Sequence, residues 1–149
     1  MEQAKTEKPF LTIDRTYPVA PEKVWRAWTD PEALKRWWGP EPGTRVSLVE
    51  LDVRVGGPFR IVFGPTGAEH EAAGVYQVVD KPRKLAFTWC WPNSTPERVS
   101  LVTIQFMPTA GGTELLFRHD GFFDQAAADG HKRGWTGAFG SLDQYLHSL

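Results

Sequence analysis

Residues 20–40 read "APEKVWRAWTDPEALKRWWGP", and this stretch predicts two short helices in succession. Pro21 suits the first position of a helix, where its missing N–H costs nothing. Asp30 has the side chain of an N-cap, so we expect a second helix to begin at Pro31. Gly39 is a good C-cap and Pro40 prevents the helix from continuing. The second helix is therefore expected to run up to the tryptophan pair that precedes this glycine.

The pair Trp37 and Trp38 lies on one face of that predicted helix. At about 100° per residue, both indoles fall within about 60° of Leu34, so adjacent tryptophans share its apolar face. Both rings can then point inward together. The pattern favours a place in the core or in a pocket wall over an exposed patch.

Outward from this stretch, the chain reads mostly as strands. One strand is expected before it, at 10–17, and alternating apolar residues predict six more after it, at 44–51, 56–63, 69–80, 83–91, 98–106 and 113–120. The connectors are short and rich in turn-forming residues, which predicts hairpins and hence an antiparallel sheet. The clearest strand is 83–91, where Phe87, Trp89 and Trp91 share one face.

The last part of the chain predicts one long amphipathic helix, from about Gln125 to His147. Its apolar stripe consists of Trp135, Ala138, Phe139, Leu142, Leu146 and Leu149, at steps of three and four. Strands followed by a helix indicate an α+β fold. We expect one domain over 9–149, preceded by a flexible N-terminus at 1–8.

Composition excludes several classes of function. The net charge of −1 gives no basic cluster for nucleic acid or for an anionic membrane. No apolar run approaches the roughly 20 residues of a membrane span. Cys90 is the only cysteine, so an intrachain disulfide is impossible and a cytoplasmic location is expected. We expect no metal and no cofactor, since no local ligand motif is present.

Four segments carry a resemblance to a known family: 20–40, "LDVRVGGPFRI" at 51–61, "GVYQVVDKPRKLAFTW" at 74–89 and "HDGFFDQAAADGHKRGW" at 119–135. In this order they resemble the START-like superfamily, also called SRPBCC or the birch-pollen-allergen fold. More narrowly, the chain is similar to the family named after the activator of the heat-shock chaperone's ATPase. The resemblance implies a helix-grip fold, in which a curved seven-stranded antiparallel sheet wraps the C-terminal helix around a cavity.

The function we expect is binding of a small, largely apolar ligand, aromatic or lipid-like, in that cavity. One ring of the Trp37–Trp38 pair would pack in the core and the other would border the opening. The predicted ligand-binding residues, apolar walls with two histidines for polarity, are Trp38, Phe59, Trp89, Trp91, Phe117, His119, His131, Trp135 and Phe139.

Two alternatives stay open. An enzyme of the polyketide cyclase or dehydratase kind, which the superfamily also hosts, would use His119 as acid or base with a cavity carboxylate such as Glu50. A chaperone-associated stress protein is the other, although the docking domain of the founding activators has no counterpart in 149 residues, so a chaperone partner is not expected.

Three glycines in the C-terminal helix raise the question of a homodimer. Gly134, Gly137 and Gly140 each cost roughly 1 kcal/mol relative to alanine in a helix interior. On a helical wheel they fall away from the apolar stripe, so room for a ligand does not account for them. They are either tolerated on an exposed face or allow another backbone, most simply that of a second subunit, to approach closely.

Overall fold

The computed structural model describes residues 8–149, so the predicted flexible segment 1–8 lies, except for its last residue, outside the described residues. The elements follow the expected order. They are β1 (Phe10–Tyr17), α1 (Pro21–Thr29), α2 (Pro31–Lys35), β2 (Val46–Leu51), β3 (Pro58–Phe63), β4 (His70–Asp80), β5 (Lys84–Trp91), β6 (Thr95–Thr109), β7 (Gly112–Asp120) and α3 (Gln125–His147).

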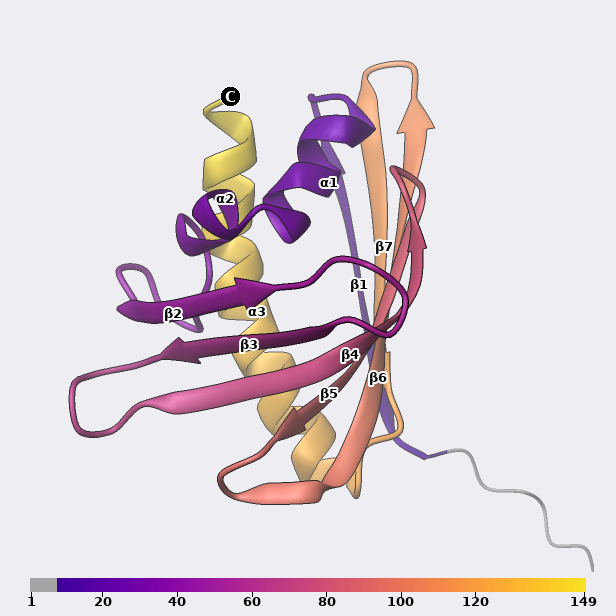
Figure 1. Cartoon of the computed structure of the whole chain (residues 1–149). Coiled ribbons are helices and arrows are strands. Elements are labelled where there is room, and N and C mark those ends of the chain that lie inside the picture. Colours follow the sequence, from indigo (N-terminus) through magenta and orange to yellow (C-terminus); the bar gives the residue numbers. More distant parts are fainter. Residues whose placement is uncertain (1–7) are drawn as a thin grey trace, which may run out of the picture.

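The seven strands form one antiparallel sheet in the order β1-β7-β6-β5-β4-β3-β2. The sheet curves, and α3 lies along the face around which the strands bend (Figure 1). The predicted helix-grip fold is thereby confirmed. The long β6 extends three residues earlier and three later than the sequence pattern indicated, because its ends pair with β5 and β7.

Both short helices begin as predicted, but the second one ends early. Pro21 is the first residue of α1, and the Asp30 carboxylate accepts a hydrogen bond from the Glu32 N–H at 3.0 Å as the N-cap of α2. Helix α2 ends at Lys35, and the tryptophan pair follows in a turn in which Trp37 N and Trp38 N both bond to Leu34 O. Both indoles are still buried as expected, since the bond from Trp38 N to Leu34 O keeps the four-residue spacing of a helical turn.

The centre of the molecule is an aromatic core beneath α1. Trp28 of α1 contacts Phe117 of β7 and Phe139 of α3, with ring centroids 6.0 Å and 5.9 Å away. Trp37 packs edge-on against Trp28 and donates from Nε1 to Ala27 O at 3.0 Å. This core fills the space between the sheet and the C-terminal half of α3. Of the tryptophan pair, Trp37 is therefore the core residue.

No helix within residues 8–149 is long and apolar enough to cross a membrane.

Candidate functional site

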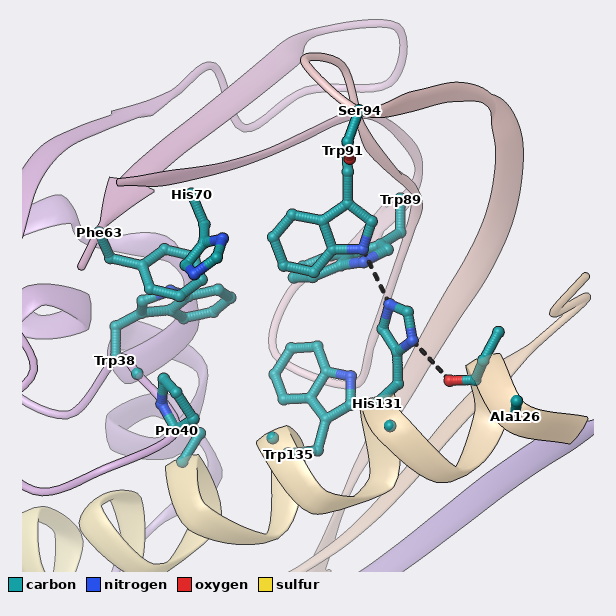
Figure 2. A pocket seen from close by; sticks show the side chains of 15 residues that line it. Trp38, Pro40, Phe63, His70, Trp89, Trp91, Ser94, Ala126, His131 and Trp135 are labelled. Carbon is teal, nitrogen blue, oxygen red and sulfur yellow. Dashed lines mark hydrogen bonds between the residues drawn. The ribbon is translucent and has the colours of Figure 1, made fainter. Parts of the chain in front are cut away.

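A cavity of about 590 Å³ lies beside the N-terminal half of α3. It is bounded by α3, by the ends of β3 and β5, by the start of β4 between them and by the turn after α2 (Figure 2). We call it the α3 pocket and define it by its lining residues: Trp38, Gly39, Pro40, Phe63, His70, Trp89, Trp91, Ser94, Ala126, Ala127, Gly130, His131, Gly134, Trp135 and Ala138.

Aromatic rings form most of the wall. Trp38 contacts Trp89 and Trp135 with ring centroids 6.0 Å and 5.5 Å away, and Trp89 contacts Trp91 edge-on at 5.4 Å. Phe63 of β3 closes the side next to Trp38 and Trp91. Trp38 is thus the member of the tryptophan pair that borders the cavity.

Small residues of α3 leave the space open on the helix side. Ala126, Ala127, Gly130, Gly134 and Ala138 line the pocket, and a Cβ added at Gly134 would meet no atom within 4 Å. The sequence expectation that a ligand space does not account for these glycines is therefore wrong for Gly134. The helical wheel placed Gly134 away from the stripe, but the turn after α2 covers α3 on that side as well.

The turn after α2 also explains why residue 137 is a glycine. A Cβ at Gly137 would overlap the Pro40 carbonyl, with its carbon only 2.7 Å away. Of the two alternatives for this glycine, close approach of another backbone is present, but that backbone belongs to the same chain. The feature that suggested a homodimer is thus accounted for within one molecule, and the homodimer stays a prediction.

His131 holds one tryptophan of the wall in place. The Trp91 indole N–H donates to His131 Nε2 at 3.0 Å, and His131 Nδ1 lies 2.8 Å from Ala127 O (Figure 2). Since an indole N–H only donates and a carbonyl only accepts, His131 must be the neutral tautomer with its proton on Nδ1. Burial lowers the pKa of His131, with the Ala127 hydrogen bond opposing it.

His119 orients a second tryptophan in the same way, deeper in the protein. The Trp135 indole donates to His119 Nδ1 at 3.0 Å, so the proton lies on Nε2, which donates to Ser100 Oγ at 2.7 Å. Burial lowers the pKa of His119 well below its usual range, and repulsion from His131 in its protonated form lowers it further. His119 is fully buried and does not line the pocket. Both of its ring nitrogens are engaged within the protein.

The structure brings five of the nine predicted ligand-binding residues to the pocket: Trp38, Trp89, Trp91, His131 and Trp135. Phe117 and Phe139 pack instead in the core around Trp28, and Phe59 packs against Tyr76 and Phe87. All three side chains face inward as predicted, but Trp28 of α1 covers Phe117 and Phe139, and rings of β4 and β5 surround Phe59.

Glu50, the carboxylate expected for the enzyme alternative, does not reach the cavity. It is exposed on β2 and pairs with Arg60 at 3.4 Å. Within residues 8–149 no Asp, Glu, Lys or Arg lines the pocket, and no three metal-ligating side chains converge. The described pocket thus has neither an acid–base carboxylate nor a countercharge for an ionic ligand.

Sequence reasoning missed Phe63, His70 and Ser94. Phe63 and His70 face each other in the β3–β4 register, and Ser94 follows β5 in a turn closed by its N–H on Trp91 O. Phe63 could have been found, because it shares a strand face with Phe59 and Ile61. His70 and Ser94 carry no such signal, since only the pairing of strands brings them to the pocket.

Comparisons with known proteins show the family and support the fold. The family described as "Activator of Hsp90 ATPase homolog 1-like protein" matches residues 18–147. Among solved structures, a protein of Chromobacterium violaceum superposes with a TM-score of 0.82 at 25% identity, covering 93% of this chain and 97% of that one.

An AHSA1 protein of Silicibacter pomeroyi gives 0.81 at 27% identity, with coverage of 93% and 97%. An AHSA1-like protein of Aeromonas hydrophila, 22% identical, shares the fold with a TM-score of 0.80 over 94% and 93% of the two chains. No curated protein matches. With the family's pattern over almost its whole length and the helix-grip fold around α3, the chain belongs to the activator of Hsp90 ATPase homolog 1-like family.

Proposed function

We propose that this protein binds a small, uncharged and largely apolar ligand in the α3 pocket. The observation that carries the proposal is a cavity of about 590 Å³ walled by four tryptophans and a phenylalanine. This volume lies within the range of roughly 300–1,000 Å³ of small-molecule sites, which are likewise mostly apolar with a few polar groups. Transfer of apolar surface from water into such a site is favourable by about 25 cal/mol per Å².

Two features support a site prepared for a ligand. The indoles of Trp91 and Trp135 are each fixed by a histidine, so the wall loses little side-chain entropy when a ligand binds. Glycines at 130 and 134 keep the helix side empty, although each costs helix propensity of roughly 1 kcal/mol. A chain that needed only a dense core would gain stability by filling this space.

The test is a titration with Prodan, an uncharged naphthalene fluorophore whose emission shifts to the blue in apolar surroundings. We expect saturable binding to the wild type. Gly134→Phe should weaken binding at least tenfold, because the ring fills the pocket, while circular dichroism and thermal melting show that the fold is kept.

Gly140→Phe is the matched control. Gly140 lies in the same helix, a Cβ there also meets no atom within 4 Å, and the residue is exposed outside the pocket. Its affinity for Prodan should stay within twofold of the wild type. No saturable binding to the wild type, or equal affinity in Gly134→Phe, would show that the cavity is not the binding site.

The two alternatives remain predictions of lesser support. The enzyme would need a catalytic carboxylate beside the pocket, and Glu50 points elsewhere. The chaperone-associated function rests on the family's description alone.

A further inference from the structure

Most polar side-chain atoms around the α3 pocket already form hydrogen bonds within the protein. The two indole N–H groups of Trp91 and Trp135 donate to histidines, and both ring nitrogens of His131 are engaged. The indole N–H groups of Trp38 and Trp89 have almost no accessible surface, so a ligand in the pocket cannot reach them. Only the side chains of His70 and Ser94 keep free hydrogen-bonding atoms among the described lining residues.

His70 is the better placed of these two. It is the first residue of β4, directly opposite Phe63, and its imidazole contacts the rings of Phe63 and Trp91 at 5.7 Å and 6.3 Å. Figure 2 shows the imidazole between these two rings. The imidazole thus lies against two residues of the wall, and His70 is exposed at the rim of the cavity. Ser94 has no comparable support, since its exposed hydroxyl follows β5 in a turn.

We infer that His70 recognises a single hydroxyl group of the ligand at the mouth of the α3 pocket. The inference rests on the proposed ligand-binding function and narrows it to an amphipathic molecule, with an apolar body among the tryptophans and one uncharged polar end. A neutral imidazole both donates and accepts, which matches a hydroxyl. A charged group carried into the interior would find no countercharge among the described lining residues.

The experiment compares two probes that differ by one hydroxyl, naphthalene and 2-naphthol, by equilibrium dialysis at neutral pH. We expect the wild type to bind 2-naphthol roughly three- to tenfold more tightly, which is the range of one neutral hydrogen bond. His70→Phe keeps a ring between Phe63 and Trp91 but removes both nitrogens. It should bind naphthalene like the wild type and lose the preference for 2-naphthol.

Three further variants sharpen the comparison. His70→Gln should restore part of the preference, because an amide again donates and accepts. Ser94→Ala should keep the preference. His147→Phe is the control for replacing a histidine by phenylalanine, because His147 is exposed on α3 outside the pocket. This variant should also keep the preference for 2-naphthol.

The outcomes separate the two proposals. If the wild type binds both probes but His70→Phe keeps the preference, or Ser94→Ala loses it, the role of His70 is wrong and ligand binding stands. If the wild type binds neither naphthalene nor 2-naphthol, both proposals fall. A preference that disappears in His70→Phe alone, at unchanged naphthalene affinity, supports the inference.

Discussion

At the scale of single residues, Gly137 shows how close the turn after α2 comes to α3. The Pro40 carbonyl occupies the space that a side chain at 137 would need. Because this carbonyl is part of the backbone, it cannot move aside as the end of a flexible side chain could. The gain in helix propensity from alanine, about 1 kcal/mol, is therefore outweighed by the clash.

We predict that Gly137→Ala lowers the free energy of unfolding by about 1–3 kcal/mol, measured by urea denaturation. Gly140→Ala is the control, because its Cβ enters open space, and it should stabilise the protein by up to about 1 kcal/mol. Equal stabilisation in both variants would mean that the turn moves away freely. The mass of both variants in sedimentation should equal that of the wild type.

At the scale of elements, the first turns of α3 matter most, because they form one side of the pocket. The helix begins with Asp124, whose carboxylate accepts a hydrogen bond from the Ala127 N–H at 2.9 Å. This cap satisfies a free N–H of the first turn and places negative charge at the positive end of the helix dipole. Ala126, Ala127 and Gly130 line the pocket within the next two turns.

We predict that Asp124→Ala lowers the free energy of unfolding by about 1 kcal/mol and weakens Prodan binding, since the first turn frays. Asp129→Ala serves as its control, because that carboxylate accepts only from the exposed Gln125 side chain. It should change stability by less than about 0.5 kcal/mol and leave Prodan affinity as it is. An undiminished stability in Asp124→Ala would show that the cap contributes nothing.

At the scale of the whole molecule, His119 and His131 make the fold sensitive to acid. Burial lowers the pKa of both below that of an unfolded histidine, about 6.5. Between these lowered values and about 6.5 the unfolded chain binds more protons than the folded one, so stability falls as the pH drops through this window. Protonation would also place a donor against the indole N–H of Trp91 or Trp135.

We predict that the free energy of unfolding decreases below about pH 6.5, by at most about 1.4 kcal/mol per pH unit for each histidine. Urea denaturation at pH 7.5 and pH 5.5 measures this. His119→Gln should show a smaller difference between the two pH values than the wild type, whatever its stability at pH 7.5. A wild-type stability that stays constant or rises between pH 7.5 and pH 5.5 would contradict the role given to the buried histidines.

Local sequence patterns were enough to define the elements and the faces they bury. The alternation along 83–91 and the stripe from Trp135 to Leu146 specify which side of β5 and of α3 is apolar, because a strand repeats every two residues and a helix every 3.6. The N-cap at Asp30 marked the break between α1 and α2 for a similar reason, since a cap acts within three residues.

Which inward residues form a pocket and which form a core depended on the packing of distant elements. Phe117 and Trp135 both face inward and both contact Trp28 of α1, yet only Trp135 also lines the cavity. The bond between Trp91 and His131 spans 40 positions, and His70 meets the pocket through its pairing with Phe63. The apolar pattern of a strand or helix indicates which of its faces is buried. Whether that face lines a cavity or a packed core depends on which other elements pack against it.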